Sequence, residues 1–287
     1  MAVYLEDNNE EFGVSHIWAN ATVKDSVITH RGTRVDMIER PKWGLACYMD
    51  NSIQSALIDE RIYHESLVHP AMMNVYKPER VMIIGGGEGA TAREVLKWPG
   101  VEQVDMYEWD CDVVHLFRGK YPQWAQGAWN DPRLQVHAVD IFEAIKIPPS
   151  CYSTYDVIIV DLFEPTDENK DKWSTLIKSL RNWLSLDGAI VMYAGMRNIL
   201  APQQPYNKLI DMIQYKEIAP GHLVRDNLYF DKSITPYRVH VPSFSGESMF
   251  LLLGGAYAPA NPNFETMAKI GSHLTVSVWN SYKALNW

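Results

Sequence analysis

The chain has 287 residues and a hydrophobic content of 47%, which suits one large globular domain or one domain with a small extension. Its net charge of −9 disfavours nucleic acid and anionic membranes as main partners and suits a cationic ligand, although ordinary solubility explains this charge equally well. The three cysteines, Cys47, Cys111 and Cys151, lie far apart without disulfide or metal-binding spacing, which predicts a reducing, cytoplasmic compartment and no structural metal. The first residues lack the apolar core of a signal peptide, and no stretch is long enough to span a bilayer.

Residues 1–72 are predicted to form a small N-terminal β-strand domain. Short segments with several β-branched or apolar residues occupy 22–29, 34–38 and 44–49, and an Asp-Asn pair at residue 50 signals a turn between strands. None of these segments shows the strand–turn–helix pattern of a nucleotide-binding unit, so we expect an antiparallel β structure here.

A helix is expected at the end of this first region. Asp59 and Glu60 suit a helix N-terminus, and apolar residues follow at near-helical spacing. The helix carries several polar side chains, among them Tyr63 and His64, and a solvated amphipathic face explains any one of them taken alone. His64 and Glu65 point about 100° apart on a helix, so register alone does not let them share a ligand.

The stretch RVMIIGGGEGATAREVL, residues 80–96, organises the rest of the chain. Its apolar run predicts a strand that is buried on both faces, and residues 90–96 are predicted to be helical. The turn between them contains Gly85, Gly86, Gly87 and Gly89. Strand, glycine turn and helix form the first nucleotide-binding unit of a Rossmann-like sheet, although a tight structural turn explains the glycines equally well. Glu88 inside the turn would repel a pyrophosphate, so a ligand with positive charge fits better.

Acidic residues follow the next two predicted strands. Residues 101–109 form the first of these, and Glu108 lies near its end, where this architecture places an acid that accepts hydrogen bonds from ribose hydroxyls. Residues 134–139 form the second, which runs into Asp140. Asp140 can accept the adenine amino group, but a helix N-cap explains it equally well.

The remaining elements complete a doubly wound α/β domain. Residues 155–160 predict a central strand that leads to Asp161, and a carboxylate at that position lies over the ligand crevice. Glu164 follows within the same loop. Helices are expected at 173–184 and 207–213, and strands at 188–193, 238–241 and 249–253. The alternation of strands and helices predicts a Rossmann-like doubly wound catalytic domain at residues 73–287.

Several motifs together resemble the polyamine aminopropyltransferase family, which contains the spermidine, spermine and thermospermine synthases. They are GGGEGATAREVLK, DERIYHESLVHPAM, Glu108 and DLFEP, and HVPSF at 240–244 is similar to the thermospermine synthase branch. The resemblance covers residues 29–253. It implies a Rossmann-like domain after an N-terminal β domain, usually as a homodimer. The implied reaction moves an aminopropyl group from decarboxylated S-adenosylmethionine to an amine or polyamine and releases methylthioadenosine.

The resemblance also implies roles for individual residues. The donor-binding residues would be Gln54, His64, Gly85, Gly86, Gly87, Glu88, Glu108, Asp140 and Ile141; the acceptor-binding residues would be Tyr63, Asp161 and Glu164. Asp161, with Tyr63, would be catalytic, orienting and helping to deprotonate the attacking amine. The chemistry supports this role independently, because an amine attacks carbon only as its free base and a nearby carboxylate can take the proton. No metal is predicted, since no ligand cluster occurs at a recognisable spacing.

Three departures from the family pattern concern the substrate walls. A glutamine of the N-terminal β domain is replaced by Val35 or a neighbour, the closing loop is replaced by TDENKDKW, and Tyr193-Ala194 replaces Thr-Gln. Two alternatives therefore stay open. One is a methyltransferase or other alkyltransferase that uses intact S-adenosylmethionine, whose carboxylate would need a cation such as Arg93 or Lys97 beside Glu88. The other is a catalytically silent relative that binds a nucleoside.

Overall fold

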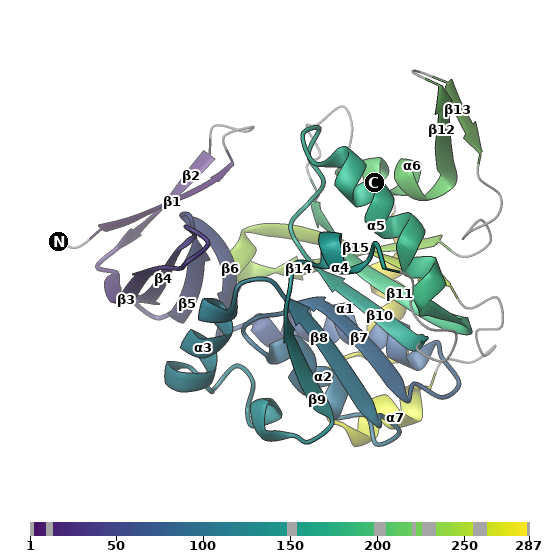
Figure 1. Cartoon of the computed structure of the whole chain (residues 1–287). Helices are drawn as coiled ribbons and strands as arrows, with labels where there is room; N and C mark the ends of the chain where they lie inside the picture. Colours follow the sequence, from purple (N-terminus) through teal and green to yellow (C-terminus); the bar gives the residue numbers. More distant parts are fainter. Residues whose placement is uncertain are drawn as a thin grey trace.

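The computed structural model describes residues 3–9, 14–147, 154–197, 205–219, 222–225, 234–254 and 263–285. Figure 1 shows a smaller all-β part at the N-terminal side and a larger α/β part that contains the rest of the chain. Of the cysteines, Cys47 is buried and Cys111 is partly buried, and both are free; Cys151 lies outside the described residues. No helix within the described ranges is long and apolar enough to cross a membrane.

The N-terminal part consists of a hairpin and an antiparallel sheet. The hairpin pairs β1 (Val3–Asn9) with β2 (Val14–Ala19). The four-stranded sheet contains, in spatial order, β3 (Thr22–Ile28), β4 (Arg34–Arg40), β5 (Gly44–Met49) and β6 (Ser52–Ala56). The predicted β structure is confirmed, and the predicted turn at residue 50 lies between β5 and β6; only the β1–β2 hairpin was not predicted.

A seven-stranded sheet forms the centre of the larger part, with the order β14-β15-β11-β10-β7-β8-β9. Its strands are β7 (Arg80–Gly85), β8 (Gln103–Glu108), β9 (Leu134–Ala138), β10 (Tyr155–Asp161), β11 (Leu184–Met196), β14 (Ile234–Val241) and β15 (Gly246–Gly254). The strands from β7 to β11 run parallel, and β15 is antiparallel to both of its neighbours. The predicted Rossmann-like fold is confirmed, with an antiparallel edge that the pattern did not reveal.

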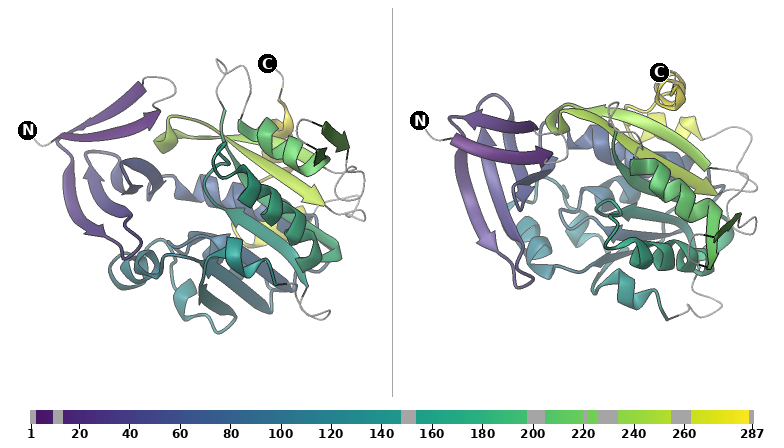
Figure 2. Two further views of the ribbon diagram at one scale, coloured as in Figure 1. Left: turned by 45° about the horizontal axis from the view of Figure 1, so that its top comes forward. Right: turned by 90° about the horizontal axis from the view of Figure 1, so that it is seen from above.

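Helices cover both faces of this sheet (Figure 2). They are α1 (Glu60–Met73), α2 (Ala90–Leu96), α3 (Cys111–Lys120), α4 (Ile141–Ala144), α5 (Lys170–Trp183), α6 (Pro205–Gln214), α7 (Phe264–Lys269) and α8 (Val276–Lys283). Two short 3-10 turns, Ala128–Asn130 and Pro242–Phe244, and a small hairpin of β12 (Tyr215–Ala219) and β13 (His222–Arg225) complete the described elements.

The central strand β7 shows why its sequence is apolar throughout. Val81 and Ile83 belong to one hydrophobic core, while Met82 and Ile84 belong to the core on the other face of the sheet. Successive side chains of a strand point to opposite faces, so a strand covered on both faces needs an unbroken apolar run.

The helix α1 packs against the larger part of the molecule. It contacts α2, β10 and β11, and its buried residues Leu67 and Met72 belong to the same core as Val81. The sequence placed a domain boundary at residue 72, after this helix. We propose instead that the boundary follows β6, so that α1 belongs to the catalytic part.

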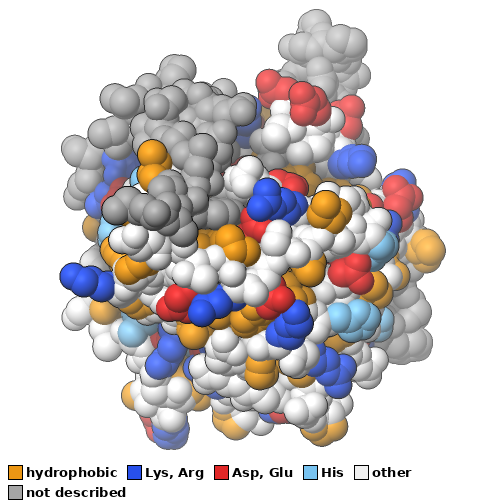
Figure 3. Space-filling model, turned by 90° about the vertical axis from the view of Figure 1, so that its left-hand side faces the viewer, with side chains coloured by type: hydrophobic (Ala, Val, Ile, Leu, Met, Phe, Trp, Pro, Cys, Tyr) orange, Lys and Arg blue, Asp and Glu red, His pale blue; other side chains and the backbone are white. Residues whose placement is uncertain are grey.

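Charged side chains of both signs are intermixed on the described part of the face shown in Figure 3, together with scattered hydrophobic side chains.

Candidate active site

A cavity of about 540 Å³ lies over the carboxyl ends of the parallel strands. The chain leaves β7 toward β8 on one side of the sheet, whereas β10 pairs with β7 on the other side, so the cavity occupies the position where the strand order reverses. All of the predicted site residues line it: Gln54, Tyr63, His64, Gly85, Gly86, Gly87, Glu88, Glu108, Asp140, Ile141, Asp161 and Glu164. The N-terminal part contributes a wall through Gln54 of β6 and Thr33, which directly precedes β4.

The glycine turn has a geometric requirement at its first residue. Gly85 has a φ of +87°, a conformation that residues with a side chain rarely adopt. A Cβ atom at this position would collide with the backbone oxygen of Asp161 on the adjacent strand. Gly85 therefore lets β7 and β10 end side by side, which brings the carboxylate of Asp161 to the floor of the cavity.

Asp161 is held by two hydroxyl groups. The Tyr63 hydroxyl donates to its Oδ1 at 2.8 Å, and the Thr91 hydroxyl donates to its Oδ2 at 2.9 Å. Burial, together with the negative charge of Glu88, raises the pKa of Asp161 to about 6, against the opposing effects of the His64 charge and of these hydrogen bonds. A carboxylate with this pKa is ionised at neutral pH and still basic enough to accept a proton.

Thr91 is a residue that sequence reasoning missed. It lies in the first turn of α2, directly after the glycine turn, and is fully buried. Its hydroxyl group faces the end of β10, which is the neighbour of β7 in the sheet. The sequence does not give the order of the strands, so this contact could not be predicted.

Aromatic rings surround Tyr63. The rings of Phe250, Phe244 and Tyr193 lie 5.4, 5.6 and 5.8 Å from it, measured between centroids. The Tyr193 hydroxyl hydrogen-bonds Glu164, and burial raises the pKa of Tyr193 well above its usual value. This wall combines aromatic faces with the carboxylates of Asp161 and Glu164, which suits an alkylammonium ligand.

His64 and Glu88 form an ion pair at the edge of the cavity. His64 Nε2 lies 2.7 Å from Glu88 Oε1, and Nδ1 lies 2.7 Å from the backbone oxygen of Glu60 and 2.9 Å from its Oε2. Burial lowers the pKa of His64, but the hydrogen bonds with Glu60 and Glu88 outweigh this effect and raise it to about 10. The neighbouring Glu65 points away and pairs with Arg61 and His273, as the helical geometry requires.

The two acids after β8 and β9 differ in environment. Burial raises the pKa of Glu108 to about 7, against the effect of a hydrogen bond from the Asp110 amide at 3.0 Å. Asp140 caps α4, since its side chain accepts a hydrogen bond from the Phe142 amide at 2.9 Å. The capping interpretation of Asp140 is therefore confirmed, and the residue lines the cavity as well.

The residues that depart from the family pattern differ in whether they line the cavity. Val35 belongs to the hydrophobic core and does not line the cavity, and the neighbour that does so is Thr33. Tyr193 lines the cavity, whereas Ala194 is buried behind it. From the replaced loop, Asn169 and Lys172 reach the cavity wall.

One group of potential metal ligands was not visible in the spacing of the sequence. A nitrogen of His64 and carboxylate oxygens of Glu88 and Asp161 lie within 4.8 Å of one another. The three residues come from α1, the glycine turn and β10, so only the fold brings them together. The absence of a metal requirement therefore stays a prediction.

Comparison with known proteins identifies the class of enzyme. Residues 60–261 match the spermine/spermidine synthase domain, and the chain belongs to this family of transferases. The polyamine aminopropyltransferase of Pyrobaculum calidifontis is 37% identical over 220 residues, which cover 76% of this chain and 71% of that protein. Polyamine aminopropyltransferase 1 of Hyperthermus butylicus is 37% identical over 220 residues, or 75% of this chain and 69% of the relative.

Solved structures agree on the fold. Spermidine synthase from Thermotoga maritima superposes with a TM-score of 0.80 and 23% identity, over 99% of this chain and 91% of that structure. A spermidine synthase in complex with the transition-state analogue AdoDATO gives a TM-score of 0.82, also at 23% identity, with 99% and 92% covered.

Proposed function

We propose that this protein transfers an aminopropyl group from decarboxylated S-adenosylmethionine to an amine or polyamine and releases methylthioadenosine. The observation that carries the proposal is the gathering of Glu88, Asp161 and Glu164 in one cavity, where each can face a cationic group. Among the described residues that line the cavity, Lys172 is the only lysine or arginine. Donor and acceptor of this reaction are both cations, and they match such a site.

The nucleoside of the donor would lie along the ends of β7, β8 and β9. Glu108 would accept hydrogen bonds from the ribose hydroxyls, and Asp140 with Ile141 would contact the adenine. Glu88 would pair with the aminopropyl ammonium, so the predicted donor contact of His64 would act mainly through Glu88. Gln54 would close the site from the N-terminal sheet.

The intact donor fits less well. It carries a carboxylate next to its ammonium, and a cation would have to hold that carboxylate near Glu88. Arg93 and Lys97 do not line the cavity, since Arg93 pairs with Glu60 and Glu94, and Lys97 also pairs with Glu94. Lys172 is exposed and acts electrostatically on Glu143 of α4, so it would lie toward the proposed adenine end of the cavity rather than beside Glu88.

The acceptor would lie between Tyr63, Asp161 and Glu164. Its nitrogen attacks the carbon beside the sulfonium, so that a C–N bond forms while the C–S bond breaks and methylthioadenosine leaves. Asp161 would take the proton that the nitrogen loses and direct its lone pair, with Tyr63 and Thr91 fixing the carboxylate. Glu164 would hold a second charge of the acceptor.

The test is to incubate the protein with the decarboxylated or the intact donor and a panel of amines, and to identify the nucleoside product. We expect methylthioadenosine from the decarboxylated donor and turnover at least roughly 100-fold slower with the intact donor, since each uncompensated charge at such a site costs several kcal/mol. Release of S-adenosylhomocysteine would instead show methyl transfer. Tight nucleoside binding without turnover of any pair would indicate a catalytically silent relative.

Replacing Thr91 with valine tests the support of Asp161. This change keeps the shape and removes the hydrogen bond that lowers the pKa of Asp161. Since Asp161 acts as its carboxylate, activity falls below its pKa, and we expect the acid limb of kcat/KM in Thr91→Val to move to higher pH. A loss of roughly 10-fold in turnover should accompany this shift, as for one hydrogen bond to a charged group. An unchanged pH profile would remove Thr91 from this role.

Activity should not require a metal. Both ring nitrogens of His64 already contact carboxylate or carbonyl oxygens, and a metal ion would have to displace them. Turnover should therefore be the same before and after treatment with a chelator. Loss of activity in the chelator, with recovery on adding one particular metal, would contradict this expectation.

We further propose a homodimer in the cytoplasm and a thermospermine-like product. The product is suggested by HVPSF at residues 240–244, whose Phe244 lines the cavity beside Tyr63. Light scattering tests the dimer, and chromatography of the products made from spermidine distinguishes thermospermine from spermine.

A further inference from the structure

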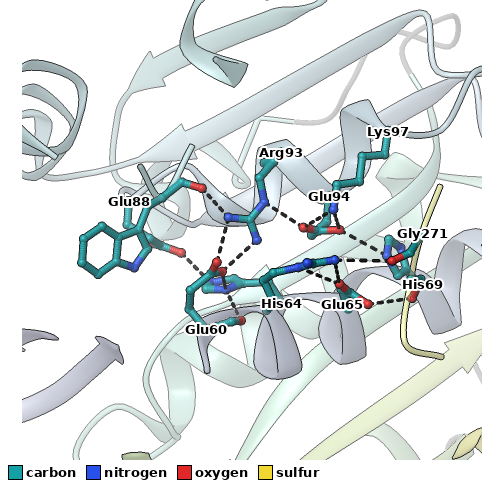
Figure 4. A network of polar contacts seen from close by, with 12 residues as sticks. Glu60, His64, Glu65, His69, Glu88, Arg93, Glu94, Lys97 and Gly271 are labelled. Carbon is teal, nitrogen blue, oxygen red and sulfur yellow. Dashed lines mark hydrogen bonds and ion pairs between the residues drawn. The ribbon is translucent and has the colours of Figure 1, made fainter. Parts of the chain in front are cut away.

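A buried network of charges extends from the cavity into the space between α1 and α2 (Figure 4). Its members, which we call the Glu60 network, are Glu60, His64, Glu88, Arg93, Glu94 and Lys97. Arg93 donates to both carboxylate oxygens of Glu60, at 2.9 and 2.8 Å, and to Glu94 at 2.7 Å. Lys97 donates to Glu94 at 2.7 Å. Glu60 then contacts His64, which contacts Glu88 at the cavity.

The geometry fixes the protonation of His64. Its Nδ1 faces the backbone oxygen and a carboxylate oxygen of Glu60, and its Nε2 faces a carboxylate oxygen of Glu88. Ionised carboxylates and carbonyls only accept hydrogen bonds, so both ring nitrogens must carry a proton. His64 is therefore an imidazolium, and its raised pKa agrees with this conclusion.

This protonated histidine creates a difficulty for a cationic ligand. His64 is 2% exposed, so water screens its charge poorly, and it touches the carboxylate that would bind a ligand ammonium. Left uncompensated, the imidazolium would neutralise Glu88 and repel the incoming cation.

Glu60 supplies the compensation. It is 3% exposed, and although burial acts in the opposite direction, the hydrogen bonds from His64 and Arg93 keep its pKa below the usual value. His69 also lies 3.3 Å from Glu94, but burial lowers the pKa of His69, so it is not counted as a cation. The network then contains three cations, His64, Arg93 and Lys97, and three anions, Glu60, Glu88 and Glu94.

We propose that Glu60 is a positioning residue that offsets the charge of His64 and so keeps Glu88 available for the ammonium group of the donor. Arg93 holds both oxygens of Glu60 and thereby fixes the direction from which it meets His64. The inference rests on the proposed function, because it assumes that the ligand of Glu88 is the donor ammonium.

The charge balance makes opposite predictions for two substitutions. Glu60→Gln leaves the network with one excess positive charge, so this variant should bind the decarboxylated donor more weakly. His64→Gln leaves one excess negative charge and should strengthen its binding. The double variant is balanced again and should bind it about as the wild type does.

Calorimetry should compare two ligands, decarboxylated S-adenosylmethionine and methylthioadenosine, because only the first carries the ammonium. In Glu60→Gln we expect the preference for the first over the second to fall roughly 10-fold, the scale of one poorly screened charge. Methylthioadenosine affinity itself should change little. If Glu60→Gln does not fold, the increased preference expected in His64→Gln carries the test.

Glu65→Gln is the matched control. Glu65 is also buried on α1 and paired with basic side chains, Arg61 and His273, but it does not contact His64 or Glu88. The Glu65→Gln variant should be less stable than the wild type, but its preference for decarboxylated S-adenosylmethionine over methylthioadenosine should not change.

The inference is overturned if Glu60→Gln weakens both ligands equally, if the double variant shows no recovery, or if His64→Gln lowers the preference. Failure of the proposed function looks different. In that case the wild-type protein itself would show no preference for the decarboxylated donor and would release no methylthioadenosine.

Discussion

Asp161→Asn should bind methylthioadenosine as the wild type does and turn over roughly 10²–10⁴-fold more slowly, the range typical of a lost general base. The carboxylate of Asp161 lies at the end of β10, and the enzyme's own hydroxyls occupy it from two sides. Asparagine has nearly the same shape and can keep one of these hydrogen bonds, but it cannot take a proton from the acceptor amine. The nucleoside would lie over β7 to β9, away from the substituted group.

The stability of this variant separates a catalytic from a merely structural role. The pKa of Asp161 is raised from 3.8 to about 6 in the folded protein, so the folded state holds this proton more tightly than the unfolded state. The contribution of this protonated carboxyl group to the free energy of unfolding is present at low pH and is lost as the pH rises through 6. Asparagine does not ionise and therefore avoids the cost of a buried negative charge at high pH. The variant should therefore be at least as stable as the wild type at about pH 8. Loss of a simple capping group would instead lower stability by about 1 kcal/mol.

Glu164→Gln serves as the neighbouring control. Glu164 lies in the same loop and lines the same cavity, but its contact is with Tyr193 rather than with Tyr63 and Thr91. It should affect mainly the KM of the acceptor. A folded Asp161→Asn protein that binds nucleoside and turns over at a near-native rate would end the proposed role of Asp161.

The sequence was sufficient to predict the parallel strands of the sheet and a set of residues that line the cavity at their ends. The positions of these residues can be predicted from local patterns, because an apolar run followed by glycines or by an acid marks the end of a strand. The carboxyl ends of parallel strands then meet at one edge of the sheet. For this reason Glu108 and Asp161, far apart in the chain, could be assigned to one cavity that the structure now shows.

The contacts between these residues could not be predicted in the same way. The pair of Thr91 and Asp161, and the link from Arg93 through Glu60 to His64, join elements whose distance depends on strand order and helix packing. From the sequence, Glu60 was expected at a helix N-terminus and Arg93 was considered only as a cation for an intact donor. Their burial, with 3% and 4% exposed, is a tertiary property that the sequence does not reveal.

Glu108→Gln should weaken methylthioadenosine binding by roughly 1–3 kcal/mol at about pH 8, the usual loss for a hydrogen bond to a charged partner. With a pKa of about 7, Glu108 in the wild type is ionised at pH 8 and protonated at pH 6. Its carboxylate accepts from both ribose hydroxyls only when ionised, so nucleoside affinity in the wild type should fall as the pH drops through 7. The variant has no ionisable group at this position and should lose that dependence.

The accompanying change in stability has a definite sign. The pKa of Glu108 is raised from 4.5 by burial, so its contribution to stability is present at low pH and is lost as the pH rises through 7. Glu108→Gln should therefore be at least as stable as the wild type at pH 8, and weaker binding cannot then be attributed to unfolding. Because Asp161 titrates near pH 6, Asp161→Asn is the control that must keep the pH dependence of nucleoside binding. Calorimetry at several pH values that shows the same affinity in wild type and Glu108→Gln would remove Glu108 from the ribose site.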